Sequence, residues 1–219
     1  MSMDAIQFIE QDLKRGKKHE TLLQIVVLSA ALLFPVALGI GLRRHYAGAL
    51  EPRVFIPNLV ATFLLGGGLL WMFRSRFSSA RIFYWAMLAF ALGLILATER
   101  VFFPVGERTF YASSDVFWGE TGGCFLKGAV ESLVLGAALS FISFKYSAWP
   151  SRRWRALISV AIGVSGAVML GFHCDSSSPE HVLIGHVGQG VFTGLIAFFF
   201  QNRIFASKMK TLFPTLKRL

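Results

Sequence analysis

Cysteine is scarce in this chain: Cys124 and Cys174 are the only two among 219 residues. Neither belongs to a C-x-x-C pair, so the spacing excludes the common zinc modules that are built from such pairs. A single pair of thiols also falls short of the two pairs that a quinone-linked generator of disulfides needs. No G-x-S-x-G, P-loop or H-E-x-x-H motif occurs, and we therefore expect that the protein is not an enzyme.

Charged residues are also few. They make up 16% of the chain against 54% hydrophobic residues, which is more apolar surface than a soluble domain of this length needs. Six apolar runs are each long enough to cross a hydrocarbon core of about 30 Å as a helix, the form that satisfies backbone hydrogen bonds in lipid. We predict an all-α, polytopic membrane protein with six transmembrane helices in contact with membrane lipid. The predicted spans are Leu22–Leu42, Val54–Phe73, Ile82–Thr98, Cys124–Phe144, Ala156–Phe172 and Val182–Phe200.

The net charge of +10 does not indicate direct nucleic-acid binding, because the basic residues stand in short clusters beside the apolar runs. One side of the membrane carries most of them: Lys14, Arg15, Lys17, Lys18, Arg74, Arg76, Arg81, Lys145, Arg152, Arg153, Arg155, Arg203, Lys208, Lys210, Lys217 and Arg218. The other side carries only Arg43, Arg44, Arg53, Arg100 and Arg108. The positive-inside rule therefore places both termini in the cytoplasm. This gives a cytoplasmic leader (1–21), a transmembrane domain (22–202) and a basic cytoplasmic tail (203–219).

Two polar segments outside the spans have their own patterns. In the leader, Ile6, Ile9 and Leu13 recur at helical spacing, and Asp12 lies on another face. This pattern fits a helix on the membrane surface and a docking helix for a cytoplasmic partner equally well. In the longest outer link, Glu99–Gly123, aromatic residues alternate with charges, which predicts a partly helical cap lying along the outer interface.

The two cysteines are predicted to lie at the outer ends of consecutive antiparallel helices, spans four and five. A disulfide between them needs those helix ends to pack directly, on the side of the membrane where disulfides persist. Metal binding is the competing use, because His173, His181 and His186 add imidazole ligands of the kind that zinc and other thiophilic metals favour. His181 and His186 are five residues apart, so we expect them to be poorly aligned on one helix.

Two ionisable residues fall inside span four. Cys124, Lys127 and Glu131 share one face of a helix, and ionisable residues within a span usually face the bundle interior or water. We expect Lys127 to extend toward the interface, and Glu131 to form a polar element coupled to the cysteines. A small metal-handling transporter or channel lined by Glu131, His181 and His186 is the alternative. A structural membrane subunit stapled by its cysteines is a third.

From Cys124 to Phe200 the chain resembles the NrsF-like family of six-span membrane anti-sigma factors. The matching residues are Gly123-Cys124, Arg152-Arg153-Trp154-Arg155, His173-Cys174, Pro179 and His186. The resemblance implies a protein of the bacterial inner membrane that sequesters an extracytoplasmic-function sigma factor. It also implies that a metal or redox signal at the sensing pair, Cys124 and Cys174, releases that factor. The implied contacts with the sigma factor are Ile6, Ile9, Asp12 and Leu13 in the leader.

Overall fold

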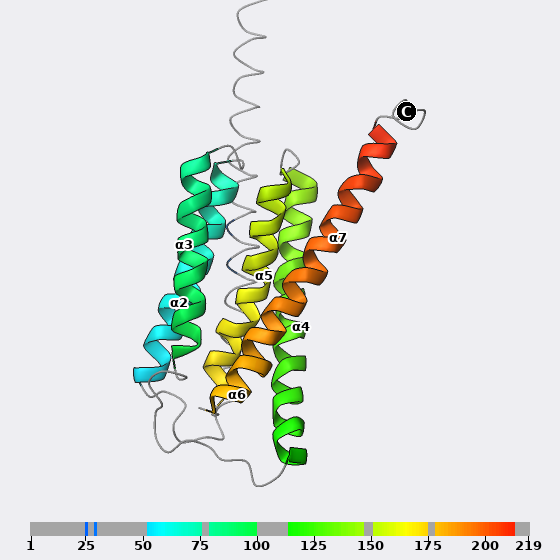
Figure 1. Cartoon of the computed structure of the whole chain (residues 1–219). Coiled ribbons are helices and arrows are strands. Elements are labelled where there is room, and N and C mark those ends of the chain that lie inside the picture. The colour runs from blue at the N-terminus through cyan, green and yellow to red at the C-terminus, as the bar shows by residue number, and fades with distance from the viewer. Residues whose placement is uncertain are drawn as a thin grey trace, which may run out of the picture.

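The computed structural model describes Ile25, Ser29 and residues 52–75, 79–99, 114–146, 151–174 and 178–212. Within these residues the regular structure is helical throughout, which confirms the all-α prediction for this part of the chain. Figure 1 shows the helices gathered in one bundle. They are α2 (Pro52–Arg74), α3 (Ala80–Ala97), α4 (Ser114–Tyr146), α5 (Arg152–His173), α6 (Pro179–His181), the π-helical segment η3 (Val182–Gly188) and α7 (Gln189–Leu212).

Five of these helical stretches are long and apolar enough to cross a membrane: Phe55–Arg74, Ala80–Ala97, Val116–Ser140, Arg152–Phe172 and Pro179–Ile204. They correspond to the last five of the six predicted spans, so a multi-pass membrane protein is confirmed. The predicted first span lies outside the described residues apart from Ile25 and Ser29, which are both helical. The leader also lies outside them, with Ile6, Ile9, Asp12 and Leu13.

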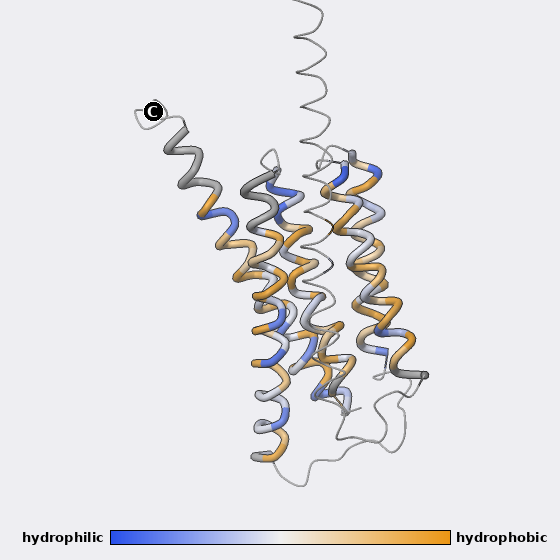
Figure 2. Tube along the Cα trace, turned by 180° about the vertical axis from the view of Figure 1, so that it is seen from behind, coloured by the Kyte–Doolittle hydropathy of each residue, from blue (hydrophilic) through white to orange (hydrophobic). Residues whose placement is uncertain are grey.

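Helix α5 is the centre of the bundle. Within its span 83% of the residues are buried, against 22–39% in the other four, because α5 packs against α2, α3, α4 and α7. Its apolar side chains meet those of its neighbours in one core, whose largest fully buried members include Leu65, Phe90, Leu135, Ile158, Ile162 and Phe172. The outer helices keep large apolar side chains exposed, Phe63 and Phe199 among them, and Figure 2 shows the apolar stretches along these helices. Such surfaces face lipid in a membrane protein.

Glycines set the closest helix contact. A β-carbon added to Gly163 of α5 would collide with the carbonyl oxygen of Gly190 of α7, so the two backbones touch. One turn further along α7, a β-carbon on Gly194 would lie 3.1 Å from the carbonyl oxygen of Ser159. Small residues at membrane helix interfaces allow this close approach. The face of α5 that carries Ser159 and Gly163 is therefore an interface with α7.

Helix α4 begins much earlier than predicted. It starts at Ser114, so the expectation that Cys124 opens this span is wrong, and the second part of Glu99–Gly123 is helical and continuous with the span. Gly122 and Gly123 each disfavour a helix by about 1 kcal/mol relative to alanine. Packing outweighs this effect, because Thr121 on the same turn is fully buried. Figure 1 shows α4 extending past the end of α5.

The last predicted span is a single run of helix with a change of type inside it. Ser178 caps its start, since its Oγ accepts a hydrogen bond from the backbone N–H of His181, and Pro179 takes the first helical position. Segment η3 follows α6 directly, and α7 continues it to Leu212. The first part of the predicted tail, residues 203–212, is thus helical, and residues 213–219 lie outside the described residues.

Candidate metal centre

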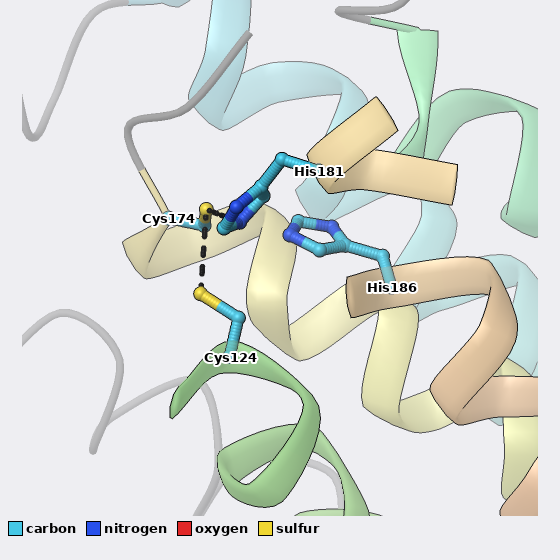
Figure 3. A group of neighbouring side chains, drawn as sticks. All are labelled: Cys124, Cys174, His181 and His186. Atoms are coloured by element: carbon cyan, nitrogen blue, oxygen red, sulfur yellow. Dashed lines mark hydrogen bonds between the residues drawn. The ribbon is translucent and has the colours of Figure 1, made fainter. Parts of the chain in front are cut away.

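Four side chains converge where α5 ends. Cys124 comes from α4, Cys174 follows α5, His181 ends α6 and His186 belongs to η3 (Figure 3). Their sulfur and nitrogen donor atoms all lie within 4.8 Å of one another. The structure therefore brings together four of the five candidate ligands named from the sequence. His173 is the last residue of α5, and its side chain lies outside the described part of the chain.

The end of α5 is fixed by contacts with α2. Asn58 Nδ2 donates a hydrogen bond to the carbonyl oxygen of Gly171 at 3.2 Å, and a β-carbon on Gly171 would collide with the Asn58 side chain. Phe172 packs edge-on against Phe55, with ring centroids 5.8 Å apart. Cys174 comes next and ends the helix, with its N–H bonded to the carbonyl oxygen of Leu170 at 2.8 Å. Its position thus depends on packing between two spans.

The two cysteines are reduced and close enough to share one ion. Their sulfur atoms are 3.6 Å apart, whereas a disulfide requires about 2.05 Å. Two thiolates on a tetrahedral zinc ion lie about 3.8 Å apart, given Zn–S bonds of about 2.3 Å. Cys174 is buried and Cys124 is half-buried, so the cluster is reached from the side of Cys124. The sulfur positions fit a metal site and need little movement to form it.

His181 is held in place by a residue that the sequence did not single out. Its Nε2 lies 3.2 Å from the sulfur of Cys174, and its Nδ1 lies 3.1 Å from the hydroxyl oxygen of Thr121. When Nδ1–H donates to Thr121, Nε2 presents its lone pair to the cluster. Metal-binding histidines usually have such a partner on the second nitrogen, which fixes tautomer and ring orientation. Thr121 lies three residues before Cys124, on the same helix face, but it had been assigned to a link.

His186 reaches the cluster because of the π-helical segment. On an α-helix, residues five apart are separated by about 140° around the axis, so His181 and His186 were expected to be poorly aligned. Segment η3 has i→i+5 hydrogen bonds, which place residues five apart above one another. The two imidazoles are consequently neighbours, with ring centroids 5.6 Å apart and planes at 72°. The expected misalignment is wrong for this reason.

The environment of His186 suits a metal ligand. The residue is 2% exposed, and within the part of the chain that the structure describes neither ring nitrogen has a hydrogen-bond partner. Figure 3 shows its ring directed toward His181 and the two sulfur atoms. Buried polar atoms are nearly always paired, so an unpaired imidazole beside two thiols indicates that a ligand completes the group. Two thiolates and two imidazoles form a donor set that zinc takes in structural sites.

The surroundings of the Cys174 thiol agree with this reading. The hydrogen bond from the Cys124 thiol holds the pKa of the Cys174 thiol well below its usual range. Burial opposes this effect, and the two imidazoles reinforce it. The thiolate is the form of cysteine that binds metals.

Polar side chains continue from the cluster into the bundle. Glu131 is buried two turns beyond Cys124 on α4, whereas Lys127 between them is exposed. Gln189 of α7 is fully buried, and its Nε2 donates to the hydroxyls of Ser132 at 2.9 Å and Thr193 at 3.0 Å. Among the described residues, neither Oε2 of Glu131 nor Oε1 of Gln189 has a hydrogen-bond partner. Beyond this point the buried face of α4 is apolar, with Leu135 and Leu139.

Comparison of the chain with protein-family models, with curated proteins and with solved structures found no significant match.

Proposed function

We propose that this protein is a metal-responsive anti-sigma factor of the bacterial inner membrane. Cys124, Cys174, His181 and His186 bind one zinc ion or another thiophilic metal ion at the outer side of the bundle. Occupancy of this site then controls the retention of an extracytoplasmic-function sigma factor on the cytoplasmic side. The observation that carries the proposal is the convergence of four donor atoms within 4.8 Å, contributed by segments that are far apart in sequence.

The position of the cluster supports a sensing role. Both cysteines lie toward the end of the bundle that the distribution of lysine and arginine places outside the cytoplasm. The leader, which carries the proposed sigma-factor contacts, belongs to the opposite side. A signal received at the cluster must therefore pass along the spans, and α7 leads from the cluster toward the cytoplasmic end. Signalling requires two packings of the bundle that differ in affinity for the partner.

The donor set also decides which signals the site can receive. Thiolate and imidazole ligands favour Zn²⁺ and copper over hard cations such as Mg²⁺. Oxidation is a second chemical input, because an oxidant such as a peroxide can take two electrons and two protons from the thiols to form a disulfide. Metal binding and disulfide formation would each change the free thiols of Cys124 and Cys174. The metal is the input we favour, since a disulfide would leave both imidazoles without a role.

The test is affinity capture of the detergent-solubilised protein from its host, with zinc, with a chelator, and with or without a reductant. The proposal predicts that a sigma factor co-purifies and that its amount changes with zinc. Cys174→Ser should keep the protein in the membrane and remove this zinc dependence. Deletion of residues 1–13 should remove the sigma factor in every condition. Absence of a sigma factor from all captures would refute the anti-sigma assignment.

A metal-handling transporter or channel is the second candidate, and the buried polar side chains below the cluster favour it. Glu131 and Gln189 offer oxygen ligands on the cytoplasmic side of the thiols, although Leu135 and Leu139 close the buried face beyond them. Uptake of radioactive zinc into reconstituted vesicles distinguishes the two functions. Transport that is lost in Glu131→Leu would establish the second candidate. Vesicles that bind zinc without accumulating it would support the sensor.

A further inference from the structure

We infer that the π-helical segment η3 is the element that couples occupancy of the metal centre to the position of α7. This inference rests on the proposed function and adds the regulation of that site. Segment η3 spans Val182–Gly188 and is continuous with α7, the helix that leads away from the cluster. It begins directly after His181 and contains His186. The π-helical turns thus lie between the two imidazole ligands.

The spacing of the histidines makes the helix type depend on the metal. His181 and His186 are five positions apart in sequence. Both imidazoles face one ion only if the chain between them is π-helical, since an α-helix would separate them by about 140° around the axis. An ion bound by both rings therefore favours the π form. Without the ion, the α form competes, because π-helical turns are rare in proteins and occur mostly at functional sites.

Conversion of one π turn to an α turn displaces everything that follows. Because a π turn holds one more residue than an α turn, its loss advances the rest of the helix by one residue, about 1.5 Å along the axis and 100° around it. The α6 end is tied to α4 and α5 through His181, which contacts Thr121 and Cys174. The displacement therefore falls on α7.

The crossing between α5 and α7 favours one of these two registers. In the π form Gly190 lies against Gly163, and in the α form Gln189 would take its place. A β-carbon at this position would lie 3.0 Å from the carbonyl oxygen of Gly163, a tight contact that requires the neighbouring backbone to shift by a few tenths of an ångström. The same shift would put Thr193 in the place of Gly194, whose β-carbon position is 3.1 Å from the oxygen of Ser159. A change of register therefore crowds both contacts and moves the two backbones apart by a few tenths of an ångström.

Two further features fit a change of register at this crossing. Gln189 bonds Ser132 of α4 at 2.9 Å in the π form, and its displacement would break that bond. A groove of about 390 Å³ runs along the crossing, lined by Val160, Val187, Val191 and Leu195 among others. Figure 1 shows the far half of α7 leaving the bundle.

A one-residue deletion separates metal binding from this coupling. Removal of Ile184, an exposed residue of η3, takes out the extra residue and leaves His181 and His186 four positions apart. On an α-helix, residues four apart share a face, so both imidazoles can still reach the metal. Helix α7 keeps its register against α5, and no π turn remains to convert. The variant should bind zinc and fail to respond to it.

The experiment measures the distance between α3 and α7 in the full-length protein in detergent, with zinc and with a chelator. Spin labels are attached to keto amino acids placed at the exposed positions Tyr84 and Phe199, which leaves both cysteines intact. A rotation of about 100° at a side-chain radius of about 5–6 Å moves the α7 label by about 8 Å. Zinc binding is measured on the same samples by calorimetry. Ile184→Ala serves as the control of unchanged length, and deletion of Leu183 is a second route to the same register.

We expect a zinc-dependent change of the label distance in the native sequence and in Ile184→Ala. We expect none in either deletion variant, although both bind zinc within about tenfold of the native affinity. Zinc binding by the native sequence with no change in distance would overturn the inference and leave the metal centre standing. An unaltered distance change in a deletion variant that binds zinc would overturn it as well. Failure of the native sequence to bind zinc would refute the metal centre itself, and this inference with it.

Discussion

Replacement of His186 by leucine should have opposite effects on stability in the absence and in the presence of metal. Its imidazole is buried with both nitrogens unpartnered among the described residues. In the metal-free protein with η3 in the π form, this group therefore carries a desolvation penalty that no hydrogen bond offsets. Leucine is similar in size and carries no polar atom, so His186→Leu should stabilise the metal-free protein.

General magnitudes apply to both effects. A buried polar group without a partner costs about 1–3 kcal/mol, and this is the expected gain in the free energy of unfolding without metal. With zinc at about 1,000 times its Kd, the native protein gains about 4.1 kcal/mol that the variant lacks. For a chain of this length, 1 kcal/mol corresponds to about 2–4 °C in Tm. The two proteins should therefore exchange their order of stability when zinc is added.

The assay is thermal unfolding of both proteins in detergent, followed by circular dichroism, with a chelator and with a zinc titration. His181→Leu is the matched control. It removes an imidazole that contacts Thr121 and Cys174, so it should lower Tm even in chelator. A His186→Leu variant that melts below the native protein in chelator would show that this histidine is a structural residue. A variant that zinc still stabilises fully would show that His186 is not a ligand.

Three other substitutions test the site and its surroundings. Thr121→Val should weaken zinc binding by about 10–100-fold in calorimetry because His181 loses the partner of its Nδ1, whereas Thr121→Ser should bind nearly as the native protein does. Cys174→Ser should abolish zinc binding and leave helix content by circular dichroism unchanged; retained binding would remove this residue from the ligand set. Gly163→Val should prevent the close approach of Gly190 and lower Tm by several degrees with and without zinc; an unchanged Tm would contradict the backbone contact.

The sequence was sufficient to predict the helical class, the approximate positions of five spans and the closeness of the two thiols. These features depend on apolar runs of bilayer length and on the distribution of basic residues, which are properties of local sequence. The close contact between Gly163 of α5 and Gly190 of α7 emerged only from the structure.

The parts that could not be predicted depend on tertiary packing. Gly122 and Gly123 look like a helix boundary by propensity alone, and only the burial of Thr121 shows that α4 continues through them. The alignment of His181 with His186 depends on a change of helix type that no residue preference signals. Both errors concern the metal centre, where local preference and final structure disagree.

X-ray absorption spectroscopy at the zinc edge of the purified, zinc-loaded protein tests the central claim most directly. We predict one zinc ion per chain with two sulfur neighbours at about 2.3 Å and two nitrogen neighbours at about 2.0–2.1 Å. His186→Leu should lose one nitrogen neighbour, and Cys174→Ser should lose one sulfur neighbour. A first shell of oxygen and nitrogen without sulfur, or no stoichiometric zinc, would contradict the assignment of Cys124, Cys174, His181 and His186 as a metal centre.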